Sequence, residues 1–145
     1  SDGGKLGMPR YFSFAELTHT DTGLANIPNW EQVENLKELA YWLDDVREYF
    51  GLPIRVNCAF RSKAVNARVG GVSTSAHLDG FAADISAWSG KESDNRRLLN
   101  ILKTYTVDQL IHYHAVAGVE SSPIRFIHVG LKRKKGSKRM QILCK

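Results

Sequence analysis

The residues in this sequence whose types and spacing best suit metal chemistry are His77, Asp84 and His128. His77 and Asp84 lie seven residues apart with Gly80 between them, and a glycine permits a turn that places the carboxylate on a following strand. A catalytic zinc commonly takes imidazole nitrogens and a carboxylate oxygen from the protein and leaves a fourth position for water. We therefore expect His77 and Asp84 to supply two ligands and a distant residue to supply the third.

His128 is the strongest candidate for the third ligand. It lies in the apolar segment 126–130 (FIHVG), where a lone imidazole needs a special reason. The competing interpretation is a hydrogen-bonded core histidine, which is the more common role of a single histidine in a strand. Spacing alone leaves both interpretations open, because His-x6-Asp is a weak pattern.

Two N-terminal helices that would support such a site are predicted from caps and apolar spacing. Residues 13–16 (SFAE) have the Ser-x-x-Glu form of a capping box, so a short helix should begin there. Asn29 and Gln32 form a similar pair at the start of a longer helix, which Gly51 ends. The apolar positions of the longer helix recur at helical spacing and are Val33, Leu36, Leu39, Leu43, Val46 and Phe50.

The remaining chain alternates between strand-like and helical runs. The predicted strands cover residues 54–60, 81–88, 107–114, 125–132 and 140–145, and the predicted helices cover 62–69 and 93–105. The last connections are too short for helical crossovers, which favours antiparallel pairing through hairpins. We therefore predict an α+β fold class, with helices packed on one face of a mainly antiparallel sheet.

The chain has the size of one compact domain. It has 145 residues, of which 43% are hydrophobic, and no apolar run approaches the ~20 residues that a membrane span needs. Residues 1–7 have the composition of a vector remnant or linker, so we expect a single domain over residues 8–145.

The charge balance is basic, because 20 Lys and Arg residues outnumber 15 Asp and Glu residues and give a net charge of +5. A basic protein favours polyanionic surroundings such as nucleic acid, anionic lipid or the bacterial wall. Much of the excess lies in residues 132–139 (KRKKGSKR), whose Gly-Ser centre predicts a hairpin turn between two strands. No aromatic residues interleave with this run, so a solvated turn is favoured over a nucleic-acid patch.

The two cysteines, Cys58 and Cys144, lie far apart and form no CxxC pattern. A disulfide framework is therefore not expected. Buried free thiols are the favoured interpretation, and a single bridge between the two stays open.

Three ordered motifs resemble those of the zinc D-alanyl-D-alanine carboxypeptidase family. Residues 75–84 (SAHLDGFAAD) match its S-x-H-x-x-G-x-A-x-D signature, and residues 126–130 resemble its closing [FW]-[IV]-H-V strand. Residues 58–71, which contain CAFRS, Asn66 and VGG, resemble its S-G-Y-R-S … N … V-G-G segment. Residues 11–17 and the long helix resemble the phage-type branch of the family, so the similarity runs from about Met8 onward.

This resemblance implies a fold shared with lysostaphin-type peptidases and the hedgehog signalling domain. It also implies that His77, Asp84 and His128 hold zinc, although two imidazoles and a carboxylate also suit iron, cobalt or nickel. Arg61 matches the residue that holds the substrate carboxylate, a role that suits the guanidinium fork. Ser75 is expected to orient a ligand or the backbone of the metal loop.

The sequence departs from the family at the position of the general base. Relatives often read D-Q-L-I-x-E, whereas residues 108–112 (DQLIH) are followed here by Tyr113, and Arg125 stands where other relatives carry a glutamate. Tyr113 is the first candidate to fill the gap, as a donor to the developing oxyanion, and His114 is the second, as a general base. On a regular strand only one of them can face the metal, and His112 and His114 would share the opposite face unless a bulge intervenes.

The resemblance predicts a zinc-dependent peptidase that hydrolyses amide bonds in bacterial wall peptides through metal-activated water. The partners of such an enzyme would be peptidoglycan stem peptides or cross-links. It would act in the periplasm, in the cell wall or during phage lysis. Nucleic acid and a membrane span are not expected. Two alternatives stay open: a catalytically silent zinc-containing binding module of the same fold, and a basic nucleic-acid-binding domain whose affinity falls steeply with salt.

Overall fold

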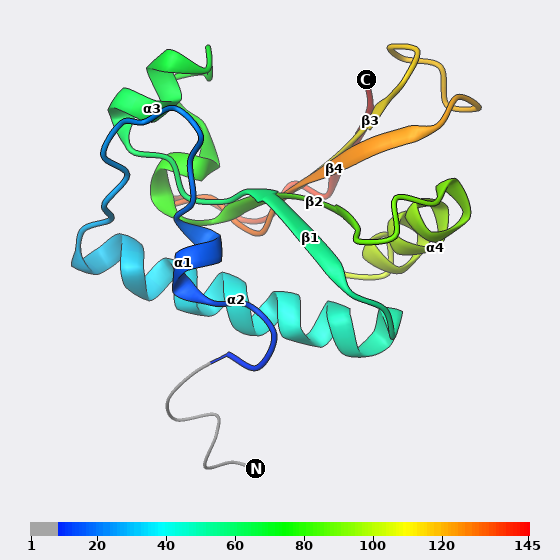
Figure 1. Ribbon diagram of the computed structural model, residues 1–145, viewed down its shortest axis with the longest axis horizontal. Helices are drawn as coiled ribbons and strands as arrows, with labels where there is room; N and C mark the ends of the chain where they lie inside the picture. The colour runs from blue at the N-terminus through cyan, green and yellow to red at the C-terminus, as the bar shows by residue number, and fades with distance from the viewer. Residues whose placement is uncertain (1–8) are drawn as a thin grey trace.

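The computed structural model describes residues 9–145, which form one α+β unit (Figure 1). The predicted vector or linker segment 1–7 lies outside the described residues. In chain order the elements are α1 (Phe14–Leu17), α2 (Trp30–Phe50), β1 (Ile54–Cys58), α3 (Lys63–Arg68), the 3-10 helix η2 (Ala76–Asp79), β2 (Ala82–Ala87), α4 (Glu92–Leu102), β3 (Gln109–His114), β4 (Ile124–Gly130) and β5 (Gln141–Cys144).

The predicted helix starts are confirmed by their caps. The Ser13 hydroxyl accepts the Glu16 backbone N–H at α1, and Asn29 and Gln32 form a complete capping box at α2. Gly51 ends α2 in the left-handed conformation, with φ 79°. Residues 76–79 form η2, which ends at Gly80.

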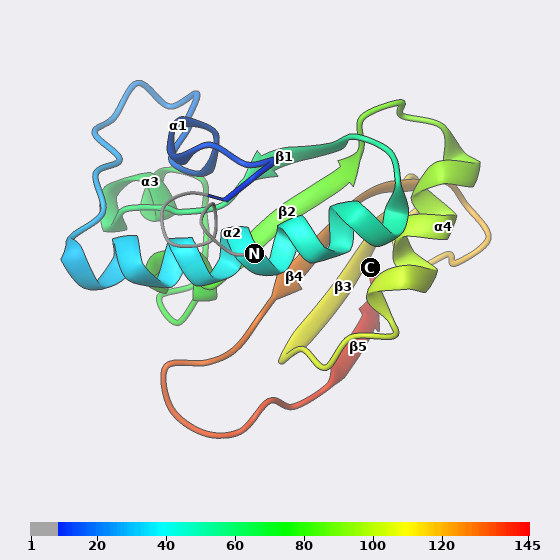
Figure 2. The same cartoon turned by 90° about the horizontal axis from the view of Figure 1, so that it is seen from below.

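The five strands form one sheet in the order β1-β2-β4-β3-β5. Its first three pairings are antiparallel, and the last, between β3 and β5, is parallel. Figure 2 shows α2 and α4 lying across the same face of the sheet. The fold class predicted from the sequence, with helices on one face of a mainly antiparallel sheet, is confirmed.

The hairpin predicted between the last two strands is wrong. Both edges of β4 are already occupied, by β2 and by β3, so β5 cannot pair with it. Residues 131–140 instead carry the chain past β3 to the outer edge of the sheet, where β5 runs parallel to β3. Backbone bonds from Met140 to Val107 and from Gln141 to Asp108 hold the end of this crossover segment.

The hydrophobic core lies between the sheet and its helices. Leu39, Leu43 and Val46 of α2 are fully buried, as are Ile85 of β2 and Ile127 of β4. The alternation along each strand leaves the other sheet face for polar side chains. Among the residues described, no helix combines the length and apolarity that crossing a membrane requires.

Candidate metal and substrate site

His77 is held rigidly by the short η2 turn. The Ser75 hydroxyl accepts the backbone N–H of His77 at 3.2 Å, so Ser75 holds the backbone of the turn that carries this histidine. Gly80 closes the turn with φ 82°, and a side chain there would meet the Gln32 carbonyl oxygen at 2.9 Å. The Nδ1 atom of His77 lies 2.6 Å from the Ala59 carbonyl oxygen, which can only accept, so Nδ1 carries a proton and Nε2 is the ring nitrogen that points at Asp84.

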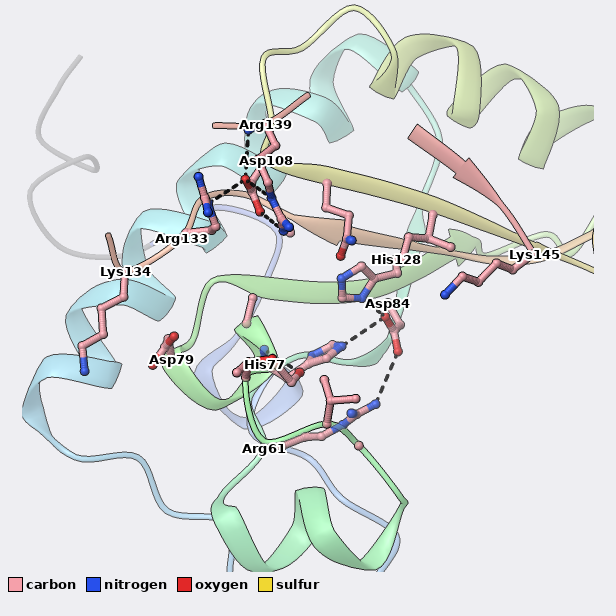
Figure 3. A pocket seen from close by; sticks show the side chains of 18 of the residues that line it. Arg61, His77, Asp79, Asp84, Asp108, His128, Arg133, Lys134, Arg139 and Lys145 are labelled. Atoms are coloured by element: carbon pink, nitrogen blue, oxygen red, sulfur yellow. Dashed lines mark hydrogen bonds and ion pairs between the residues drawn. The ribbon is translucent and has the colours of Figure 1, made fainter. Parts of the chain in front are cut away.

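Asp84 and His128 are brought together by strand pairing. They are direct partners across the antiparallel β2 and β4 ladder, so their side chains leave the same face of the sheet. His128 Nδ1 lies 2.9 Å and His77 Nε2 lies 3.2 Å from Asp84 Oδ1. Figure 3 shows the three side chains converging from η2, β2 and β4. One ligand atom from each residue lies within 4.8 Å of the others.

This donor set fits a divalent metal. His77 donates its second ring N–H to a backbone carbonyl, an arrangement typical of metal-ligating histidines. Burial opposes ionisation of Asp84, but hydrogen bonds from His128 and His77 and the charges of both rings outweigh it and hold the pKa of its carboxyl below the ordinary value. The carboxylate is therefore in the charged form that a metal needs.

Arg61 lies beside this cluster. Its backbone N–H donates to the His77 carbonyl at 3.1 Å, and its Nη2 atom lies 3.7 Å from Asp84 Oδ2. Nε donates to Cys58 Sγ and Nη1 to Asn66 Oδ1, each at 3.3 Å. The side chain is 17% exposed, so the guanidinium is fixed in place yet reachable from outside.

The cluster opens into a cleft of about 940 Å³. The strand residues that line it, such as Tyr113 and His128, alternate with core residues, so the cleft lies on the sheet face opposite the core helices. Five basic residues line it in addition to Arg61, namely Arg133, Lys134, Lys135, Arg139 and Lys145. Asp108 lies among them and is clamped by Arg139, through Nε at 3.0 Å and Nη2 at 2.7 Å, with Arg133 Nε at 3.3 Å (Figure 3). Part of the basic run 132–139 therefore lines the cleft, and its positive charge favours an anionic ligand there.

The two candidates for the missing catalytic group lie on opposite faces of β3. Tyr113 lines the cleft and stacks on Phe126, with ring centroids 4.6 Å apart. Burial and the Asp84 charge raise the pKa of Tyr113 against the opposing effect of Arg61, so its hydroxyl stays protonated and can donate. His114 faces away from the cleft, as strand alternation requires, and packs against His112. Its position argues against the predicted role as general base.

Sequence reasoning missed the role of Asp108 in the cleft. The available signal was a carboxylate at the start of a strand in a chain with a dense basic run. The two cysteines are free, as favoured from the sequence, although both are only half-buried.

Comparison with known protein families gives a match that covers most of the chain. A family model described as Peptidase M15 matches residues 10–129, a span that contains Arg61 and all three predicted metal ligands. No curated protein matches the chain.

Proposed function

The chain belongs to the peptidase M15 family, and from this premise we propose that it is a zinc peptidase that hydrolyses amide bonds in bacterial cell-wall peptides. The family match confirms the family resemblance of the three motifs and supports a metallopeptidase in general. The observation that carries the proposal is the convergence of His77, Asp84 and His128 in an open cleft.

His77, Asp84 and His128 would hold the metal. Zinc bound there would supply a Lewis acid for the scissile carbonyl and would acidify a water molecule at its open position. The chain's own contribution is to fix the donors: Ala59 sets the His77 tautomer, and Ser75 holds the turn that carries it. Neither contact depends on a flexible surface side chain.

Arg61 would bind a carboxylate of the substrate next to the metal. Asn66 and Cys58 hold its guanidinium, so little side-chain entropy is lost when a substrate binds. The basic residues along the cleft would contact further carboxylates of a wall peptide, which carries several. This charge pattern supports stem peptides or cross-links as the substrate class, and a setting in the periplasm, the cell wall or phage lysis.

Tyr113 would donate a hydrogen bond to the oxygen on which negative charge develops. Its protonated hydroxyl suits donation, and its stacking on Phe126 fixes the ring. The same residue motivates the alternative function, a zinc-containing binding module without turnover, because relatives often carry a glutamate at this position.

Metal analysis combined with a peptidase assay separates these functions. Peptidoglycan stem peptides are incubated with the purified protein, with and without chelator, and the products are identified by mass spectrometry. We expect chelator-sensitive release of D-alanine or cross-bridge residues, restored by zinc and abolished in His128→Ala. Zinc binding without cleavage of any wall peptide would favour the silent module. Failure to bind zinc at His77, Asp84 and His128 would overturn the site itself.

A further inference from the structure

A second cluster of metal-ligand side chains lies on the other face of the sheet from the cleft. His112 and His114 are two residues apart on β3, and Cys144 of β5 is the direct partner of His112 in the parallel ladder. One ligand atom from each residue lies within 4.8 Å of the others. Both imidazoles are 3% exposed, while Cys144 is half-buried at the sheet edge and gives an entry path from solvent.

The proton positions in this cluster follow from its hydrogen bonds. His114 Nδ1 lies 2.7 Å from the Ser122 carbonyl oxygen, which can only accept, so Nδ1 carries the proton. The His114 Nε2 lone pair then accepts from His112 Nδ1 at 2.6 Å. His114 is therefore oriented as metal-bound histidines usually are, with one nitrogen anchored on a backbone carbonyl and the other directed at a shared point.

The charged groups around the cluster are Glu92, Glu120, Arg96 and Lys103. The nearby carboxylate of Glu92 is occupied by Arg96 and by the Ile124 backbone N–H, and so it does not compete for the two imidazoles. Two imidazoles and a thiolate form a borderline-soft set that suits zinc.

We propose that His112, His114 and Cys144 form a second zinc site, distinct from the site in the cleft. Binding displaces the thiol proton of Cys144 to solvent and moves the shared imidazole proton to His112 Nε2, while the bond from His114 to Ser122 is kept. The ion ties edge strand β5 to β3, the strand that also carries Tyr113 on its opposite face. Its effect would be on the stability of this edge of the sheet, and it does not depend on hydrolysis in the cleft.

Sulfur ligation is the property that separates the two sites, because the cleft donors are nitrogen and oxygen only. X-ray absorption of the unmodified protein loaded with two equivalents of zinc should show a sulfur scatterer at the Zn–S distance of ~2.3 Å. A zinc shell of nitrogen and oxygen alone would overturn the proposal. This measurement requires no variant, so it is unaffected by folding defects.

Variants assign the sulfur to Cys144. In His128→Ala, which weakens the cleft site, cobalt should still produce a thiolate charge-transfer band, and native mass spectrometry should still show one zinc per chain. Adding Cys144→Ser should abolish both signals, whereas the matched Cys58→Ser should leave them unchanged. Loss of the band with Cys58→Ser instead, or zinc retained in the Cys144→Ser background, would contradict the assignment. Saturation by copper(I) but not by zinc would overturn the choice of metal.

Discussion

At the scale of single residues, Tyr113 is the side chain whose replacement distinguishes chemistry from binding. Its ring stacks on Phe126 and the residue lines the cleft, so Tyr113→Phe removes the hydroxyl donor while keeping the packing. Loss of one oxyanion donor typically lowers kcat by about 10²-fold. We expect a loss of that order with KM and zinc content nearly unchanged, measured by steady-state release of product from stem peptides. An unchanged kcat would remove Tyr113 from the mechanism.

The residues of the site differ in how far the sequence could predict them. The histidines and Asp84 were identified because three motifs resemble a known family, whereas their spacing alone did not separate ligands from core residues. The structure adds the pairing of Asp84 with His128, a contact set by strand register over 44 residues of sequence. His114 shows the limit of the approach: its chemistry suited a base, but alternation along β3 directs it to the other face.

At the scale of elements, the segment from α3 to η2 determines where Arg61 points. Asn66 of α3 accepts from Arg61 Nη1 and donates to the Val72 carbonyl at 2.9 Å, so it links the guanidinium to the loop after Gly71. A Cβ at Gly71 would overlap Asn66 Oδ1 and lie 3.1 Å from Arg61 Nη1. The lack of a side chain at Gly71 is therefore a condition for the position of the arginine.

Gly71→Ala should consequently weaken substrate binding without touching the metal. We expect KM for peptides with a free C-terminal carboxylate to rise about tenfold, the equivalent of ~1.4 kcal/mol, with zinc content unchanged. Arg61→Ala should raise the same KM at least as much, and both variants should affect amidated peptides less. Equal losses on free and amidated peptides would show that Arg61 does not bind the carboxylate.

The end of the sheet could not be predicted from local signals. The Gly-Ser centre of residues 132–139 is typical of a hairpin, and only the occupancy of both β4 edges excludes one. The helices were easier to predict, because caps such as Asn29 with Gln32 act within one turn of the chain. Interactions between residues near one another in the sequence could therefore be predicted. The placement of β5 could not, because it depends on which strands occupy the edges of β4.

At the scale of the whole molecule, the Asp108 clamp connects the crossover segment to the sheet and makes its stability depend on pH. Asp108 is 2% exposed and accepts both the side chain and the backbone N–H of Arg139. The hydrogen bond from the Arg139 side chain lowers the pKa of Asp108, burial opposes this, and the charges of Arg139 and Arg133 add to the lowering. Protonation of Asp108 would therefore loosen the segment that brings most of the basic residues to the cleft.

The sign of the pH effect follows from this lowered pKa. An unfolded aspartate has a pKa of ~3.9, so the clamp stabilises fully above that value and is lost as pH falls through the lower folded pKa. Asp108→Asn should reduce the free energy of unfolding by about 2 kcal/mol at pH 7, since charge-assisted bonds to half-exposed arginines are lost. Urea unfolding should show this difference shrinking below about pH 4.

Asp79→Asn is the matched control, because Asp79 also lines the cleft but its side chain makes no ion pair in the described part of the chain. Its free energy of unfolding should differ from that of the unmodified protein by less than about 0.5 kcal/mol at every pH. A difference for Asp108→Asn that stays constant into acid would show that the carboxylate charge is not what holds the crossover in place.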